Sequence, residues 1–300
     1  MDERRSILTR VGTLQVRVVG TGPVAVLWHS LFVDDRSWGR VEAELSRDRR
    51  LVLVTGPGHG ASSDTRHRYS LDTCARAAIE ILDALGISEP VDWVGNAWGG
   101  HVGIVFAATW PERCRTLVTL GTPTQAYGTA EKLQLRLLLG VYLMVGMVDP
   151  LARAITDALL SQQTRSSDPD ALALVVDSLR NLDRRQLVNA MLSISLGRPD
   201  LAPRLASVRC PTLFVTGSDH PEWTPEQAQA ASSLLADGAS AVVPDIAYLV
   251  PLEAPEATIQ LVRGVWARRI DSTTFGSSAA DKVHHAAAVR PIEEGAAPLS

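Results

Sequence analysis

Short, nearly continuous apolar segments recur along this sequence and limit the folds that it can adopt. They are VAVLWHS (24–30), RLVLVTG (50–56), VDWVGN (91–96), RTLVTLG (115–121), PTLFVTG (211–217) and SAVVPD (240–245). Such segments are typical of strands that are buried on both faces of a parallel sheet. Helical stretches lie between them, as over 71–85 before Gly86 and over 98–110 before Pro111. The alternation predicts an α/β fold with a mostly parallel, doubly wound sheet.

One interval contains no strand-like segment. Between residues 124 and 203 the pattern is helical, as in KLQLRLLLGVYLMVGMV (132–148). We expect 124–203 to form a helical cap inserted after the fifth parallel strand, with 1–123 and 204–270 as the core. The apolar stripe in 132–148 predicts cap core rather than a membrane contact, because Arg136 and glycines interrupt it. Beyond residue 270 the composition shifts to Ser, Ala, Gly, Pro and charge, which predicts a disordered tail over 271–300.

The composition fits one large globular core. Of the 300 residues, 46% are hydrophobic and 21% are charged, which suits a single core with an inserted subdomain. The net charge of -4 comes without a run of Lys and Arg. We therefore expect no binding to nucleic acid and none to an anionic membrane.

The N-terminus and the cysteines indicate a cytoplasmic protein. MDERRSILTR (1–10) is charged and lacks the apolar region of a signal peptide, and no stretch approaches the length of a membrane span. The three cysteines, Cys74, Cys114 and Cys210, are far apart in the sequence, which suits a reducing compartment. Metal-ligand spacing is absent, so we expect no metal and no other cofactor, while a homo-oligomer stays open.

A glycine-framed turn follows the third of the apolar segments. In VDWVGNAWGG (91–100), Gly95 and Gly99 flank position 97, and a tight strand-to-helix elbow needs small residues two positions from its centre. The central residue of such an elbow is held at positive φ, at a cost of about 1–3 kcal/mol for a non-glycine residue. That strain usually serves to expose a reactive side chain, yet Ala97 offers only a methyl group.

Four other segments complete a known pattern. They are WHSLFVDDRSW (28–38), TGPGHGASSD (55–64), VTGSDHPEWTPEQA (215–228) and DIAYLVPLEAPEAT (245–258). With the elbow, they resemble the loops of the α/β-hydrolase superfamily in order and spacing over about residues 20–266. Ser30 replaces the glycine of the family's His-Gly loop, and Thr55 replaces the acid of its Asp-x-Pro-Gly-His-Gly-x-Ser loop. The resemblance implies the α/β-hydrolase fold.

The same resemblance implies a degenerate catalytic triad. It maps the family's nucleophile, acid and base onto Ala97, Asp219 and Tyr248, so two of the three side chains are lost. A phenol is a poor base at neutral pH but can donate a proton or orient a substrate. If Asp219 accepts a hydrogen bond from the Tyr248 hydroxyl, the pair could move or donate a proton to a bound substrate, and we expect both residues to face Ala97.

The resemblance also implies an oxyanion hole made of backbone N–H groups, from Trp98 and from Leu31 or Phe32. These donors do not depend on the lost side chains. We expect an apolar pocket around them, with these lining residues: Ser30, Leu31, Phe32, Trp98, Tyr127, Tyr142 and His220. The other histidines of the family motifs, His29 and His59, are expected to brace backbone, and His101 to pack in its helix.

Three functions remain open at this stage. The first is an enzyme on a small apolar carbonyl, lactone or epoxide compound, working by hydrolysis without a covalent intermediate, or by elimination, isomerisation or cyclisation. The second is a ligand-binding protein that has lost catalysis. The third is an ordinary hydrolase inactivated by an engineered Ser-to-Ala change, against which the second loss, at Tyr248, argues. We favour the enzyme.

Overall fold

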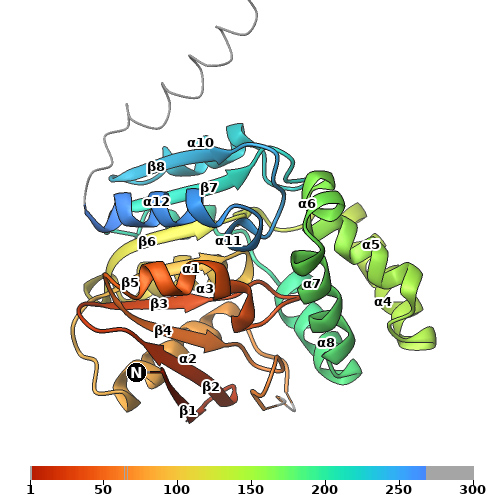
Figure 1. The fold of residues 1–300 in the computed structure, drawn as a ribbon, viewed down its shortest axis with the longest axis horizontal. Coiled ribbons are helices and arrows are strands. Elements are labelled where there is room, and N and C mark those ends of the chain that lie inside the picture. Colours follow the sequence, from red (N-terminus) through yellow and green to blue (C-terminus); the bar gives the residue numbers. More distant parts are fainter. Residues whose placement is uncertain (1, 64, 66, 268–300) are drawn as a thin grey trace, which may run out of the picture. The chain divides into compact units, whose positions relative to one another are not determined.

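The computed structural model describes residues 2–63, 65 and 67–267. Within them one eight-stranded sheet runs in the order β1-β2-β4-β3-β5-β6-β7-β8 (Figure 1). The strands are β1 (Asp2–Thr9), β2 (Gly12–Val19), β3 (Val24–Trp28), β4 (Arg50–Thr55), β5 (Val91–Asn96), β6 (Cys114–Leu120), β7 (Thr212–Gly217) and β8 (Gly238–Val243). From β4 to β8 each neighbouring pair is parallel. The predicted α/β fold is confirmed.

The antiparallel edge of the sheet differs from the sequence-based expectation. β2 pairs antiparallel with both β1 and β4, so β6 is the fourth parallel strand rather than the fifth. The count of five had included TLQVRVVG (13–20), a segment in which apolar and polar residues alternate. Its burial alternates in the same way, as in a sheet with one solvated face. β1 was missed because its sequence, DERRSILT, is mostly polar.

Helices cover both faces of the sheet (Figure 1). Those outside the 124–203 interval are η1 (Asp35–Trp38), α1 (Gly39–Leu45), α2 (Leu71–Ala84), α3 (Trp98–Thr109), η2 (Pro111–Arg113), α10 (Pro225–Ser232), α11 (Val250–Glu253) and α12 (Pro255–Trp266). α1 packs against α12, and α2 packs against α3. Both helices expected from the apolar pattern, α2 and α3, are present. α3 is buried over most of its length, which fixes the elbow at its start.

The chain between β6 and β7 is helical. It contains α4 (Thr129–Val145), α5 (Asp149–Leu159), α6 (Gln162–Ser167), α7 (Pro169–Asn181), α8 (Arg184–Ala190), the π-helical turn η3 (Met191–Ser195) and α9 (Ala202–Leu205). Figure 1 shows α4, α5, α7 and α8 grouped beside one end of the strands. The tail expected over 271–300 lies outside the described residues.

The apolar stripe of α4 is mostly not core, contrary to the prediction. Only Leu139 and Tyr142 of this helix are buried, whereas Leu137 is 64% and Met144 is 77% exposed. α4 is apolar around most of its circumference, and a helix can turn only one side toward the rest of the molecule. No helix in the described part of the chain has the length and apolar character that crossing a membrane requires.

Two groups of buried polar side chains lie within the sheet and the turns beside it. Asp92 on β5 is fully buried and accepts hydrogen bonds from Arg49 Nε at 2.7 Å, Arg115 Nε at 2.9 Å and Thr116 Oγ1 at 2.8 Å. Cys114 and Cys210, distant in the sequence, bring their Sγ atoms to 3.7 Å, and both are free thiols. The Asp92 carboxylate therefore joins β5 and β6 to the turn that precedes β4.

Candidate active site

The elbow has the geometry that its glycines predict. Ala97 lies between β5 and α3 with φ 46° and ψ −103°. A Cβ atom on Gly95 would lie 2.2 Å from the Gly99 carbonyl carbon, and one on Gly99 would lie 1.9 Å from the Trp28 carbonyl oxygen. Strand and helix therefore pass each other only because both positions lack a side chain. Ala97 bears the strain of a nucleophile position without a nucleophile.

His29 holds the loop after β3 against the elbow. The Gly56 N–H donates to His29 Nε2 at 2.8 Å, so Nδ1 carries the proton and donates to the Ser30 carbonyl at 2.7 Å. The His29 carbonyl in turn accepts from the Gly99 N–H at 3.2 Å. Complete burial lowers the pKa of His29 to about 4, which keeps the ring neutral. His29 is a brace, as expected.

His59 braces the same loop from the other side. Its two ring nitrogens contact the carbonyl oxygens of Pro57 and Leu31, and burial lowers its pKa. Within the described residues, the backbone N–H groups of Leu31, Phe32 and Trp98 make no hydrogen bond to the chain. Trp98 is the first residue of α3, where N–H groups point outward and the helix dipole favours negative charge. The Trp98 N–H and the N–H of Leu31 or Phe32 are therefore free to bind a ligand oxygen.

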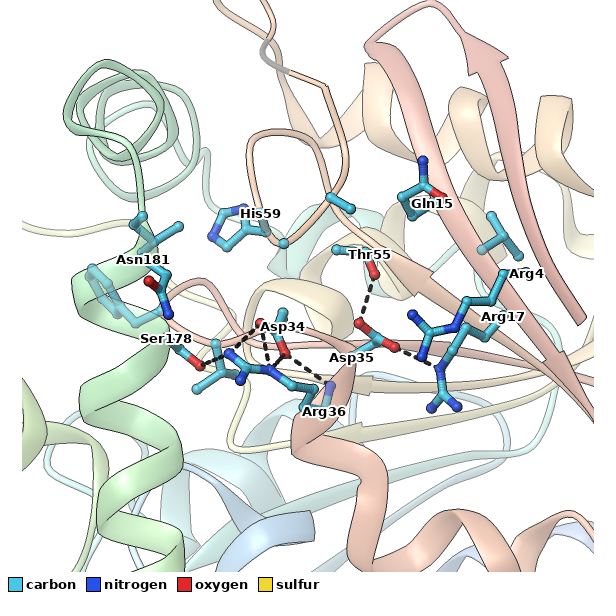
Figure 2. Close-up of a pocket in the computed structure, with 16 residues that line it drawn as sticks. Arg4, Gln15, Arg17, Asp34, Asp35, Arg36, Thr55, His59, Ser178 and Asn181 are labelled. Carbon is cyan, nitrogen blue, oxygen red and sulfur yellow. Dashed lines mark hydrogen bonds and ion pairs between the residues drawn. The ribbon is translucent and has the colours of Figure 1, made fainter. Parts of the chain in front are cut away.

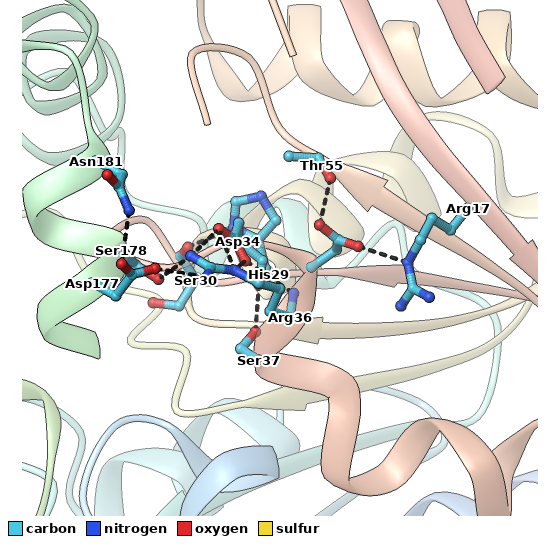
Figure 3. Close-up of polar contacts among 11 residues, drawn as sticks. Arg17, His29, Ser30, Asp34, Arg36, Ser37, Thr55, Asp177, Ser178 and Asn181 are labelled. Carbon is cyan, nitrogen blue, oxygen red and sulfur yellow. Dashed lines mark hydrogen bonds and ion pairs between the residues drawn. The ribbon is translucent and has the colours of Figure 1, made fainter. Parts of the chain in front are cut away.

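Ion pairs fasten the next part of the loop to its surroundings (Figure 3). Arg36 binds Asp34 within the loop and reaches Asp177 Oδ2 on α7 at 2.7 Å. Burial alone would raise the pKa of Asp34, but hydrogen bonds from Arg36 outweigh it and hold the pKa below its usual range. The loop that carries Leu31 and Phe32 is thereby tied to the helical segment.

Thr55 occupies the position of the family's acid. Its hydroxyl donates to Asp35 Oδ1 at 2.9 Å, and Asp35 Oδ2 accepts from Arg17 Nε at 2.8 Å (Figure 2). These residues line a polar cavity of about 390 Å³, which does not include Ala97 or Tyr248. Its acidic groups Asp34 and Asp35 are paired with arginines. A carboxylate is thus kept beside position 55, although another residue supplies it.

A second cavity, of about 220 Å³, lies over the elbow. Six of the seven predicted lining residues are in its wall, together with Ala97 and Tyr248; they are Ser30, Leu31, Phe32, Trp98, Tyr127 and Tyr142. α4, α5, α8 and η3 supply most of the remaining wall, including Leu135, Leu139, Leu151, Ile155, Leu187, Met191 and Ile194. The cavity therefore joins an apolar wall to the backbone donors of the elbow.

Tyr248 presents its hydroxyl to this cavity, but its partner is not the predicted one. The hydroxyl donates to Glu222 Oε2 at 3.0 Å, and the Tyr127 hydroxyl donates to the same oxygen at 2.8 Å. Burial raises the pKa of both phenols well above the usual range, so both remain protonated donors. The Asn96 side-chain amide fixes the Tyr248 backbone by donating to its carbonyl at 2.9 Å.

The predicted hydrogen bond between Tyr248 and Asp219 is absent from the described contacts. Asp219 is exposed, accepts from the Ser218 hydroxyl at 3.0 Å and does not line the cavity. The loop after β7 turns its carboxylate toward Ser218, whose hydroxyl also accepts from the Asp245 N–H. Glu222, three residues later, reaches the cavity instead. The loop that the family motif marks therefore lines the cavity through Glu222 and not through Asp219.

His220 lies behind Tyr248 rather than in the cavity wall, contrary to the prediction. The two ring centroids are 4.0 Å apart, and His220 Nδ1 accepts from the Glu222 N–H at 3.1 Å. Burial lowers the pKa of His220 to about 4. A neutral ring supports the phenol and orients the Glu222 backbone.

Sequence analysis did not identify three polar residues that line the cavity: Glu222, His101 and Arg198. His101, one turn into α3, has Nε2 2.8 Å from the Pro123 carbonyl oxygen, to which that nitrogen can only donate. Arg198, after η3, lies with its guanidinium 4.5 Å from the centre of the Tyr127 ring. No motif marks Arg198 or Glu222. The charge of Arg198 within the 124–203 interval was the one sequence signal that could have identified it.

Comparison with known proteins establishes the family. Residues 26–219 match the α/β hydrolase fold family, and the chain belongs to it. It is 29% identical over 210 residues to 2-hydroxy-6-oxononadienedioate/2-hydroxy-6-oxononatrienedioate hydrolase of Paraburkholderia phymatum, across 67% of this chain and 68% of that protein. It is 33% identical over 115 residues to 2-hydroxymuconate semialdehyde hydrolase of Pseudomonas sp. (strain CF600), which is 38% of each chain.

Solved structures share the fold at lower identity. The enol-lactonase from Burkholderia xenovorans LB400 superimposes with a TM-score of 0.79 at 20% identity, over 88% of this chain and 100% of that one. A thermophilic esterase from Thermogutta terrifontis gives a TM-score of 0.79 at 23% identity, over 89% and 98% of the two chains. These similarities concern the architecture only.

Proposed function

We propose that this chain is an enzyme that acts on a small, mainly apolar carbonyl compound without a covalent nucleophile. The observation that carries the proposal is the retention of free backbone N–H donors, from Trp98 and from Leu31 or Phe32, in a cavity where Tyr248 is held as a hydrogen-bond donor. The relatives named as oxononadienedioate hydrolase and enol-lactonase support a carbonyl substrate. Residues 124–203 would serve as the cap that closes this cavity.

The retained groups suit electrophilic rather than nucleophilic catalysis. A substrate carbonyl oxygen over the elbow would accept from the two backbone N–H groups, and one such donor is typically worth about 2.7–4 kcal/mol in the transition state. Ala97 leaves the space above it free for a substrate atom instead of a serine oxygen. The charge that develops on an enolate would be stabilised without any bond to the protein.

Tyr248 and Glu222 would carry out the proton transfers. Because burial keeps the phenol protonated, Tyr248 is suited to donate to a developing oxyanion or carbanion rather than to abstract a proton. The Glu222 carboxylate accepts from both Tyr127 and Tyr248, so it could take a proton from one position of the substrate. It would pass this proton to the Tyr248 phenolate, which replaces the proton that the phenol has donated to another position of the substrate. This division of roles fits isomerisation, elimination or ring closure of a reactive carbonyl compound more closely than hydrolysis of an ordinary ester.

The Tyr248→Phe variant tests this role. Turnover of enol lactones and conjugated hydroxy-oxo acids should fall at least about tenfold in kcat, with KM changed less than about twofold, because one hydroxyl is lost from a similar ring. Tyr142→Phe is the matched control: it removes another phenol of the same cavity that does not contact Glu222, and it should leave kcat nearly unchanged.

The outcome separates the proposal from its alternative. Full turnover by Tyr248→Phe would remove the phenol from the mechanism. Binding without turnover of the whole substrate panel by the native chain would favour a ligand-binding protein, as the missing triad side chains allow. Rates should be followed by the ultraviolet absorbance of the conjugated enol, with affinity measured separately by calorimetry.

A further inference from the structure

A buried cation lines the cavity without a carboxylate partner. Arg198 is 6% exposed, and Nε of its guanidinium has no hydrogen-bond partner. In the described part of the chain, no Asp or Glu oxygen pairs with this guanidinium; its contacts are a ring nitrogen of His101 and the face of Tyr127. Taking a charge out of water without a counter-ion is costly. Arg198 therefore has unused capacity to bind an anion.

His101 does not supply the missing partner. Its Nε2 lies 2.8 Å from the Pro123 carbonyl and 3.2 Å from Arg198 Nη1. One ring nitrogen can donate to the carbonyl or accept from the guanidinium, but it cannot do both. Burial and the nearby Arg198 charge lower the pKa of His101 well below its usual range, so the ring is neutral. It contributes no negative charge in either tautomer.

Tyr127 separates Arg198 from the acidic residue of the cavity. The guanidinium lies over the ring face at 4.5 Å, while the hydroxyl of the same ring donates to Glu222 at 2.8 Å. Glu222 is thus engaged by two phenols rather than by the cation. A cation over an aromatic face gains less free energy than a buried charge loses on leaving water.

The rest of the wall determines what kind of anion fits. Arg198 is the single Lys or Arg among the described residues that line this cavity, and Glu222 is the single carboxylate. Leucine, isoleucine and methionine side chains of α4, α5 and η3 surround them. One cation matches one monoanion, and its planar, forked donors match a carboxylate better than a point charge would.

We propose that Arg198 anchors a carboxylate of the substrate, whose apolar body lies against the cap helices. This inference names the substrate class of the proposed function and rests on that function's assignment of the cavity as the substrate site. The ligand is an amphipathic monoanion: the carboxylate contacts Arg198 and the edge of Tyr127, and the chain or ring extends between α4 and α5. The reacting carbonyl then lies toward Ala97.

Binding of three probes that share one apolar chain tests the anchor without requiring turnover. Octanoate, octanol and octylammonium are titrated calorimetrically into the full-length native chain. We expect octanoate to bind at least about tenfold more tightly than octanol, and octylammonium to bind most weakly, since opposite and like charges face Arg198. Equal affinities for octanoate and octanol, or binding of neither, would overturn the proposal.

Two substitutions assign the preference to Arg198. In Arg198→Gln the octanoate preference should fall below about twofold, while the affinity for octanol changes less than about twofold. Arg184→Gln is the control: its guanidinium lies 5.8 Å from the Tyr142 ring centre but does not line the cavity, and the preference should survive. A preference that persists in Arg198→Gln would overturn the anchor.

The catalytic role of Tyr248 and the anchoring role of Arg198 can be refuted independently. Tyr248→Phe should leave the octanoate preference intact, because the phenol is held by Glu222 rather than by Arg198. Should Arg198→Gln fail to fold, Arg198→Lys retains the charge and should keep a reduced preference, and the probe series with the native chain still decides the question. Absence of turnover with a clear octanoate preference would refute the catalytic proposal and leave the anchor in place.

Discussion

At the scale of single residues, Ala97 has the most unusual backbone of the site. Its φ of 46° and ψ of −103° are outside the regions that L-residues prefer. In an ordinary member of such a fold the strain exposes a reactive side chain. Here the methyl group gains nothing from it, so the strain is an uncompensated cost in the folded state.

Replacing Ala97 by glycine should therefore stabilise the chain by about 1 kcal/mol, since relief of the strain exceeds the extra backbone entropy of glycine. Ala230→Gly, at an exposed position of α10, is the control and should cost about 1 kcal/mol. Urea unfolding of both variants measures the difference. Equal destabilisation by the two changes would show that the elbow is not strained.

At the same scale, sequence reasoning found the positions that a loop motif marks and missed those that only the folded chain brings together. Ala97, Tyr248 and six pocket residues could be named because strand-turn-helix spacing and loop order fix them. Glu222 and Arg198 could not, because their roles depend on where side chains point after packing. For the same reason the motif could not show that Asp219 does not line the cavity and that its carboxylate accepts from the Ser218 hydroxyl.

At the scale of elements, the buried parallel strands were predictable because nearly every side chain in them is apolar. β1 was not, since an edge strand with one solvated side carries polar residues. The exposure of α4 was missed because apolar composition alone does not state which side of a helix is covered. Asp92 is the polar exception inside a buried strand, and its three partners explain it.

Asp92→Asn should lower the free energy of unfolding by about 3 kcal/mol, because Arg49 and Arg115 then lose a buried counter-charge. Asp48→Asn provides the comparison. Asp48 pairs with Arg263 at 2.6 Å, but both side chains are more than a third exposed, so this loss should stay below about 1 kcal/mol. Denaturant unfolding of both variants checks the prediction, and similar losses would contradict the role of burial.

At the scale of the whole molecule, buried neutral histidines set the response to acid. Burial lowers the pKa of His29 and of His220 from the ordinary 6.5 to about 4, and it also lowers that of His59 and His101. The unfolded chain therefore binds more protons than the folded chain between pH 6.5 and about 4. The free energy of unfolding must fall as the pH is lowered through that window.

Each such histidine contributes up to about 1.4 kcal/mol per pH unit to this fall. His220→Gln should reduce the slope by about that amount between pH values of about 6.5 and 5, while His67→Gln, at an exposed position, should leave the slope unchanged. Unfolding free energies measured by urea titration at several pH values provide the test. An unaltered slope in His220→Gln would mean that this ring is protonated in the folded chain.

The free N–H groups of Leu31 and Trp98 belong to the main chain, and this has a consequence for how such a protein can change over generations. A point mutation can delete a serine or a histidine, but it cannot delete a peptide N–H unless it introduces proline. These backbone hydrogen-bond donors are thus inherited with the fold itself. Substitutions at position 97 leave these donors intact. New chemistry can therefore arise when side chains change around the same backbone N–H groups.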